Sequence, residues 1–223
     1  MKKVSIITPC YNGESYLDRY FTSIIQQTYR PLELVFVDDG STDRTAEIAE
    51  QYKEKLSEAG VEFHCIRQEN AGQAAAMNAG FRVFTGDYLI WCDSDDILLP
   101  ENAEKKVNFM EANPQYGFAI CRGRVVNEEE PEKLLGRLYR VRPEGEDSFF
   151  YDLIREKNMY FYPGLYIARR AAMERDIPGM QIYPSRLGQN WQILLPLALH
   201  EKCGYMEDDL FRYKKKKKSH SHS

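Results

Sequence analysis

Short apolar runs alternate with amphipathic segments through the first 125 residues, and this alternation restricts the fold more than any other feature of the chain. Apolar runs at residues 4–9, 32–39, 61–68 and 87–93 predict strands, and the segments between them carry apolar residues at helical spacing. Successive strands that are joined by helices pair in parallel. The sequence therefore predicts an α/β fold with a doubly wound, mostly parallel sheet flanked by helices.

Capping and turn residues set the expected ends of several elements. Ser41 or Thr42 is expected to cap the helix after the second strand, and Gly60 to end it. A charged segment with two prolines and two glycines, residues 127–147, is expected to form a loop or excursion. Pro196 is expected to kink or end a later helix. The remaining expected elements are a helix at 102–112, a strand at 117–126, a helix at 148–158, a strand and helix start at 160–173, and a helix leading to a strand at 188–205.

Charge and composition disfavour several classes of protein. The 223-residue chain has a formal net charge of -4, which argues against a general nucleic-acid-binding surface. Its five cysteines are odd in number and widely spaced, which indicates reduced thiols and a cytoplasmic setting. No apolar run approaches the roughly 18 residues of a membrane-spanning helix. The chain is expected to be soluble, or at most peripheral to the inner face of the membrane.

The C-terminal residues 211–223 form a basic tail with an uninterrupted lysine run at 214–218. A tail of this composition without a capping pattern is expected to be frayed and solvated. Its abrupt end suggests a chain cut from a longer protein.

The ends of the four predicted strands carry the segments TPCYNG, DDGSTD, QENAG and CDSDD. In open α/β sheets, ligands bind beyond the carboxyl ends of the strands. These four segments are therefore expected to meet in one crevice.

The segment CDSDD places three carboxylates, Asp93, Asp95 and Asp96, in four positions behind a buried strand. Neighbouring carboxylates repel one another and resist desolvation, so the cluster needs compensation. Hard oxygen ligands at this spacing suit Mg²⁺ or Mn²⁺, which are usually shared with substrate phosphates. The alternative is an aspartate-rich turn that caps a helix.

The segments TPCYNGESYL, VFVDDGSTDRT and ENAGQAAAMNAGFRVFTGDYLIWCDSDD resemble family 2 glycosyltransferases of the GT-A fold in order, spacing and residue type. The resemblance is strong over residues 3–125 and weak to about residue 210. It implies a single domain, with a nucleotide-sugar-binding core at residues 1–125 and a C-terminal acceptor region at 126–210. It also implies an inverting, metal-assisted enzyme that moves a sugar from a nucleotide diphosphate sugar, with UDP favoured, to a hydroxyl of a glycan or lipid-linked acceptor.

The family's motifs imply a nucleotide-sugar site made of eight residues at the strand ends: Thr8, Pro9, Tyr11, Asp39, Asn70, Asp93, Ser94 and Asp95. Tyr11 would stack on the base, and Asp39 would accept a hydrogen bond from the base or ribose. Met77 stands where the family often has an arginine, so that contact to the donor is missing or supplied elsewhere.

The same resemblance implies that Asp95 binds the cation, Mn²⁺ or Mg²⁺, directly, while Asp93 faces the ribose or the cation's waters. The cation neutralises the diphosphate and makes it a better leaving group. His220 in the tail is a further candidate ligand, because related proteins can place a C-terminal histidine near the diphosphate.

The acidic motif that supplies the base in inverting members reads GQN here, with Asn190 at the base position. An amide cannot take the acceptor's proton near neutral pH. Three explanations stay open: another acid such as Asp176 or Asp96 is the base, amides position the acceptor for a different base, or the chain is catalytically weak. Gln189 and Trp191 are candidate acceptor contacts, although Trp191 also fits a packing role. A nucleotide-sugar-binding module with little or no transfer is the alternative function.

Overall fold

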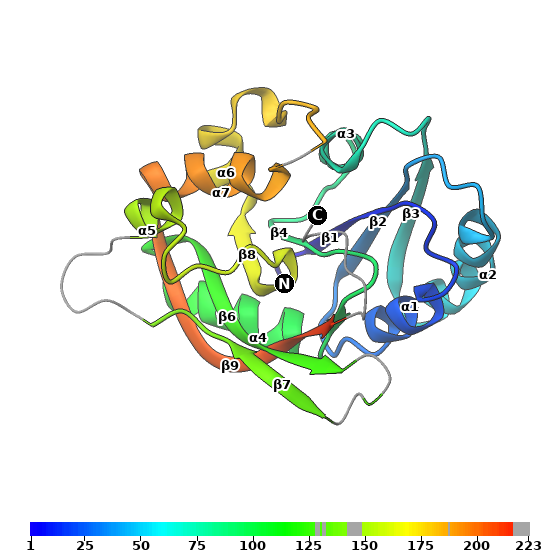
Figure 1. Ribbon diagram of the computed structural model, residues 1–223, viewed down its shortest axis with the longest axis horizontal. Coiled ribbons are helices and arrows are strands. Elements are labelled where there is room, and N and C mark those ends of the chain that lie inside the picture. Colours follow the sequence, from blue (N-terminus) through cyan, green and yellow to red (C-terminus); the bar gives the residue numbers. More distant parts are fainter. Residues whose placement is uncertain (128–129, 131–132, 142–148, 187, 216–223) are drawn as a thin grey trace.

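The computed structural model describes residues 1–127, 130, 133–141, 149–186 and 188–215. Over these residues the strands form one sheet in the order β3-β2-β1-β4-β8-β6-β9-β5, with β7 paired to β6 (Figure 1). The strands are β1 (Val4–Cys10), β2 (Leu32–Asp38), β3 (Val61–Arg67), β4 (Tyr88–Trp91), β5 (Ile97–Leu98), β6 (Tyr116–Asn127), β7 (Leu134–Leu138), β8 (Tyr166–Arg169) and β9 (Lys202–Lys215).

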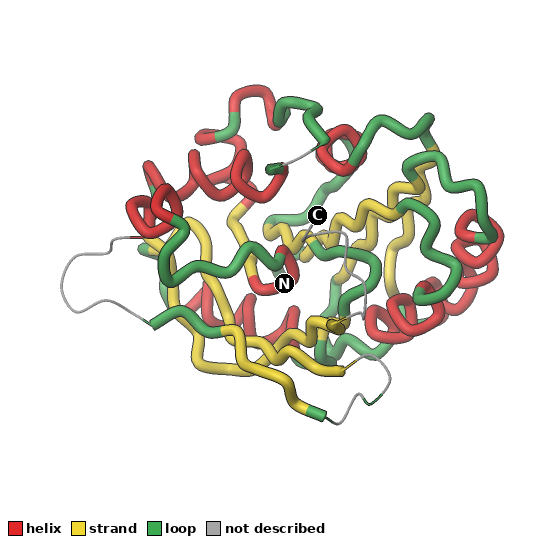
Figure 2. Tube along the Cα trace, viewed as in Figure 1, coloured by secondary structure: helices red, strands yellow, loops and turns green. Residues whose placement is uncertain are grey.

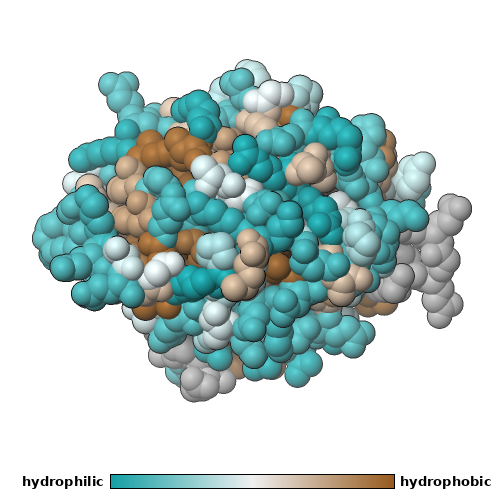
Figure 3. Space-filling view, turned by 180° about the vertical axis from the view of Figure 1, so that it is seen from behind, coloured by the Kyte–Doolittle hydropathy of each residue, from teal (hydrophilic) through white to brown (hydrophobic). Residues whose placement is uncertain are grey.

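The α-helices are α1 (Leu17–Ile25), α2 (Thr45–Glu58), α3 (Gln73–Phe81), α4 (Asn102–Ala112), α5 (Phe149–Arg155), α6 (Arg170–Asp176) and α7 (Gln189–His200). Short 3-10 helices η1 (Pro163–Leu165) and η2 (Pro178–Met180) flank β8 and α6. Among the described residues, every helix is too short or too polar to cross a membrane. The face seen from behind is mostly hydrophilic (Figure 3).

The first four strands of the chain, β1 to β4, pair in parallel. Val4 of β1 lies between Leu32 of β2 and Tyr88 of β4, and Leu32 in turn pairs with Val61 of β3. The later strands mix directions, because β8 is antiparallel to β4 and β6 whereas β6 and β9 are parallel. The predicted α/β class with a mostly parallel sheet flanked by helices is confirmed.

Helices cover both faces of the parallel strands because alternate strand residues point to opposite faces. On one face, Phe21 of α1 packs against Phe36 of β2 and stacks on Tyr52 of α2, with ring centroids 5.2 and 4.9 Å apart. On the other face, α3 approaches β1 so closely that a Cβ at Gly80 would lie 2.5 Å from Ile7 Cγ2. Figure 1 shows α3 on one side of these strands and α1 and α2 on the other.

Helix α2 begins at Thr45, so the expected cap at Ser41 or Thr42 is wrong. The Ser41 hydroxyl instead accepts the N–H of Asn12 at 2.9 Å, and the Thr42 N–H donates to Asn12 Oδ1 at 2.9 Å. Both residues therefore connect the loop after β2 to the loop after β1. Asp43 accepts the N–H of Thr45 at 3.0 Å and lies at the helix start.

Three expectations about the second half of the chain also need correction. Part of the predicted excursion forms β7, which is held by antiparallel pairing with β6. Of the kink or end expected at Pro196, the end does not occur, because α7 continues to His200 with Ile193, Leu194 and Leu197 buried around the proline. Residues 211–215 belong to β9 and pair with β6, and Phe211 is buried, so they are not a frayed tail. The lysines at 216–218 and His220 lie outside the described residues.

Candidate functional site

A pocket of about 210 Å³ lies where β1, β2 and β4 end and α3 begins. It is lined by Pro9, Cys10, Tyr11, Tyr16, Asp39, Gln73, Asp93, Ser94 and Asp95. Figure 2 shows the loops that follow these strands on one side of the sheet. Three of the four strand-end segments contribute to this lining, because parallel strands end at the same edge. The segment QENAG contributes no lining residue and instead donates hydrogen bonds to Asp39 from Gln68, Ala71 and Gly72. Of the eight predicted donor-site residues, all but Thr8 and Asn70 line this pocket.

Tyr11 lines the pocket and is 50% exposed. The loop after β1, which contains Tyr11, is held by hydrogen bonds to the segment between β2 and α2 and to the first residue of α2. The Gly13 N–H donates to Thr45 Oγ1 at 2.7 Å, and Asn12 bonds Ser41 and Thr42. An exposed aromatic on an anchored loop provides a flat surface for a planar ring.

Asp39 is a buried residue of the pocket lining, and both its carboxylate oxygens accept hydrogen bonds. Oδ1 accepts Gln68 Nε2 at 2.7 Å and the Ala71 N–H at 3.0 Å, and Oδ2 accepts the Gly72 N–H at 2.8 Å. Gly72 has φ +90°, a conformation that side-chain-bearing residues rarely adopt. Asp39 therefore holds the loop that leads into α3.

Thr8 and Asn70 lie outside the lining of the pocket. Thr8 is fully buried in β1, and its hydroxyl pairs with that of Tyr20. Asn70 donates from Nδ2 to the Asp39 carbonyl at 2.9 Å. Both side chains support the strand ends that form the pocket.

The carboxylates of Asp93, Asp95 and Asp96 each offer an oxygen within 4.8 Å of the other two. Asp93 and Asp95 are half-buried at the pocket, whereas Asp96 is 2% exposed. The Asp96 N–H donates to the Asp93 carbonyl at 3.2 Å, which folds the three acids into one turn. A set of carboxylate oxygens alone suits Mg²⁺ or Mn²⁺.

Cys10 also lines the pocket, next to Ser94. Burial raises the pKa of its thiol to about 12, and negative charges that include Asp95 add to this shift. The thiol is therefore neutral at pH 7 and a poor nucleophile or metal ligand.

The first turn of α7 contains no acidic residue. Asn190 accepts a hydrogen bond from Trp91 Nε1 at 3.1 Å and donates from Nδ2 to the Phe161 carbonyl at 2.8 Å. Trp191 stacks on Phe161, with centroids 5.4 Å apart and planes at 11°. These contacts favour packing roles for Asn190 and Trp191. Neither residue lines the pocket.

The two acids considered as replacement bases are both enclosed. The Asp176 side chain is 3% exposed, pairs with Arg175 at 3.1 Å and lies outside the pocket lining. Asp96 is enclosed within the acidic turn.

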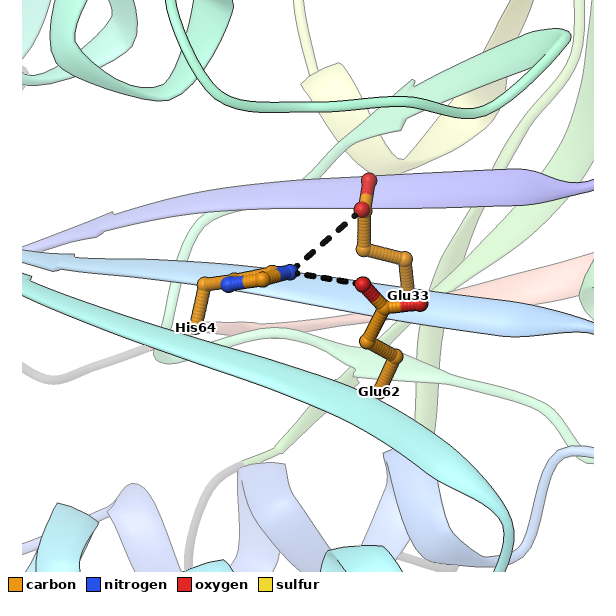
Figure 4. A group of neighbouring side chains, drawn as sticks. All are labelled: Glu33, Glu62 and His64. Atoms are coloured by element: carbon orange, nitrogen blue, oxygen red, sulfur yellow. Dashed lines mark hydrogen bonds and ion pairs between the residues drawn. The ribbon is translucent and has the colours of Figure 1, made fainter.

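A second cluster, Glu33, Glu62 and His64, lies on β2 and β3 near their N-terminal ends, away from the pocket (Figure 4). His64 Nε2 lies 3.0 Å from Glu62 and 3.5 Å from Glu33. Lys3 Nζ lies 2.6 Å from Glu62 and 3.2 Å from Glu33. The lysine already supplies the cation, so this cluster is a structural ion network.

Three lining residues, Cys10, Tyr16 and Gln73, were not among the predicted site residues. Gln73 Nε2 donates to Asp93 Oδ1 at 2.5 Å, and Gln189 Nε2 donates to Gln73 Oε1 at 2.6 Å. The position of Gln73 directly behind the QENAG strand end was a signal that could have identified it. Its link to Gln189 spans 116 residues of sequence and left no local signal.

Parallel strands whose carboxyl ends meet at an acidic pocket define an α/β protein with its candidate ligand site at the strand ends. The model of glycosyl transferase family 2 matches residues 5–177, and the chain belongs to this family. The glycosyltransferase GlyA of Streptococcus pneumoniae is 31% identical over 97% of this chain, which corresponds to 31% of GlyA. The chain thus spans about a third of that relative.

Solved structures share the fold at lower identity. S. aureus TarS 1-349 in complex with UDP-GlcNAc has a TM-score of 0.73 and 20% identity, covering 98% of this chain and 60% of that one. The mannosyltransferase PcManGT from Pyrobaculum calidifontis, in complex with GDP-Man and Mn²⁺, has a TM-score of 0.69 and 19% identity, covering 97% and 58%. The chain therefore has the GT-A architecture of these enzymes.

Proposed function

We propose that this chain is the donor-binding and catalytic region of a glycosyltransferase that moves a sugar from a UDP-sugar to a hydroxyl of a glycan or lipid-linked acceptor, with inversion and with a divalent cation. The observation that carries the proposal is the single pocket that joins the ring of Tyr11, the carboxylate of Asp39 and the acidic turn at 93–95. Family membership and the UDP-GlcNAc complex of TarS support it.

In this proposal, each residue of the pocket contacts a different part of the donor. Tyr11 stacks on the uracil, and the remaining lone pair on Asp39 Oδ2 accepts a hydrogen bond from the base or ribose. Asp93 and Asp95 hold a Mn²⁺ or Mg²⁺ ion, which neutralises the diphosphate when bound and favours its departure. Ser94, between the two acids, faces the same pocket.

A test of the proposal measures thermal shifts of the chain with UDP-GlcNAc, UDP-glucose, GDP-mannose and dTDP-glucose, each with Mn²⁺, with Mg²⁺ or with EDTA. Ligand at 100 times its Kd stabilises the folded state by about 2.7 kcal/mol, so one donor with a cation is expected to raise the Tm by about 5–10 °C. A flat response to all four donors with both cations contradicts the proposal.

A second candidate function is a nucleotide-sugar-binding module without transfer. It is favoured by Asn190, whose amide is engaged by Trp91 and Phe161 where inverting relatives would need a base. Donor binding by calorimetry, run beside UDP release with and without a panel of glycan and polyprenyl-phosphate-linked acceptors, separates the two. Binding without acceptor-stimulated UDP release supports the module.

A further inference from the structure

Two glutamine side chains link α7 to the acidic turn of the pocket. Gln189, the first residue of α7, donates from Nε2 to Gln73 Oε1 at 2.6 Å. Gln73, the first residue of α3, donates from Nε2 to Asp93 Oδ1 at 2.5 Å. Gln73 lines the pocket and Gln189 does not, so the hydrogen bond between the two amides is what links Gln189 to the pocket.

The chemistry of the amide fixes the direction of this link. An ionised carboxylate only accepts hydrogen bonds, so Gln73 must turn its NH₂ toward Asp93 and its oxygen away. The oxygen then needs a donor, which the Gln189 NH₂ supplies. Without that donor, the Gln73 amide loses the contact that holds this orientation, and its reversed form would point an oxygen at Asp93.

The loop before α3 holds Gln73 from its other side. The Gly72 N–H bonds Asp39 Oδ2, so the residue next to Gln73 is tied to the proposed base- or ribose-binding acid. Gln73 thus lies between Asp39 and Asp93 and takes its side-chain orientation from α7.

We propose that Gln189 is a positioning residue which, through Gln73, orients the Asp93 carboxylate and thereby couples α7 to donor and cation binding. The proposal rests on the proposed function, because it assumes that the pocket binds a nucleotide sugar with a cation. It assigns Gln189 a role other than direct acceptor contact.

The test measures the Kd of UDP-GlcNAc with Mn²⁺, and of Mn²⁺ alone, by calorimetry on the full chain. Gln189→Leu is expected to weaken donor binding about fivefold to tenfold, the usual range for one lost hydrogen bond to a charged network. Gln73→Leu is expected to weaken it at least as much. The double variant is expected to equal Gln73→Leu alone, because Gln189 acts only through Gln73.

Gln189→Glu sharpens the test, because its carboxylate would attract the Gln73 NH₂ and turn the Gln73 oxygen toward Asp93. Its loss of donor affinity is expected to exceed that of Gln189→Leu. Gln192→Leu is the matched control: this glutamine is on the same helix, and its amide bonds the segment at Tyr183 and Ser185. It is expected to bind within twofold of the unaltered chain.

Thermal unfolding of each variant separates lost folding from lost binding, and Gln189→Met replaces Gln189→Leu if the latter does not fold. Donor binding by Gln189→Leu within twofold of the unaltered chain, or additive losses in the double variant, overturns the link while leaving the proposed function intact. Failure of the unaltered chain to bind any nucleotide sugar overturns both.

Discussion

The indole Nε1 of Trp91 donates a hydrogen bond of 3.1 Å to Oδ1 of Asn190. Trp91 ends β4 with 2% exposure, two residues before Asp93, and Asn190 is in the first turn of α7. The other end of the Asn190 amide donates to the Phe161 carbonyl. An amide suits this place because it accepts and donates at once, which a carboxylate cannot do. The residue at the expected base position therefore fastens α7 to the strand that carries the acidic turn.

Asn190→Ala is expected to destabilise the chain by about 1–3 kcal/mol, because the buried Trp91 N–H and the Phe161 carbonyl both lose their partner. Urea unfolding measures this loss. UDP-GlcNAc binding per folded molecule is expected to change less than threefold, because Asn190 does not line the donor pocket.

Asn190→Asp tests whether an acid at this position can act as the base. Its second carboxylate oxygen would face the Phe161 carbonyl without a proton, so a loss of stability similar to that of Asn190→Ala is expected and no gain in transfer. A tenfold or larger rise in acceptor-stimulated UDP release would contradict the packing role.

Asp95→Asn is expected to abolish the difference between donor binding with Mn²⁺ and with EDTA. The amide keeps the shape of the side chain but removes the charge that balances a divalent cation. Calorimetry with and without Mn²⁺ measures the effect. Asp18→Asn, an exposed acid on α1 outside the donor pocket, serves as the control and should keep the metal dependence. Unaltered metal dependence in Asp95→Asn would refute the assignment.

Tyr11→Ala is expected to weaken UDP binding about tenfold or more, because stacking of a base on an aromatic ring contributes about 1–3 kcal/mol. Its Tm should stay close to that of the unaltered chain, since the side chain is 50% exposed. Tyr11→Phe keeps the ring and should bind UDP normally. Equal affinities for all three chains, measured with UDP and no metal, would show that the ring does not contact the base.

Most of the fold and of the pocket in the first half of the chain could be predicted from local patterns and motifs in the sequence. Alternating strands and helices placed the strand ends at one edge. The resemblance to family 2 glycosyltransferases pointed to Pro9, Tyr11 and Asp39, which line one pocket there with the acidic turn at 93–95. Such predictions succeed because a strand, its period and the polar residues behind it are neighbours in sequence.

Contacts between distant segments were not predictable in the same way. The pairs Trp91–Asn190 and Gln73–Gln189 join residues 99 and 116 positions apart, and each polar group taken alone fits many roles. The same limit explains two corrections. Ser41 was predicted to cap a helix, but its hydroxyl bonds the backbone of Asn12. Phe211 was predicted to lie in a solvated tail, but it is buried in β9. Whether 1–125 and 126–210 divide the domain by function stays a prediction.

Glu33 of β2 is fully buried and joins the N-terminal end of β1 to the segment before β4. Its carboxylate accepts hydrogen bonds from the hydroxyl of Ser5, from the N–H and hydroxyl of Thr85 at 2.9 and 2.7 Å, and from Lys3 Nζ at 3.2 Å. Burial alone would raise its pKa, but the hydrogen bonds outweigh burial and lower the pKa below the ordinary value of 4.5. The folded state therefore favours the ionised form.

The stability that Glu33 contributes is expected to be complete well above pH 4.5 and to be lost as the pH falls through its lowered pKa in the folded state. Glu33→Gln removes the charge at every pH, so it should cost about 2 kcal/mol at pH 7 and much less near pH 3. Urea unfolding of both chains at the two pH values measures the difference. Glu62→Gln, whose side chain is 51% exposed, is the control and should cost less at pH 7. A cost for Glu33→Gln that is the same at both pH values would mean that its hydrogen bonds, and not its charge, stabilise this end of the sheet.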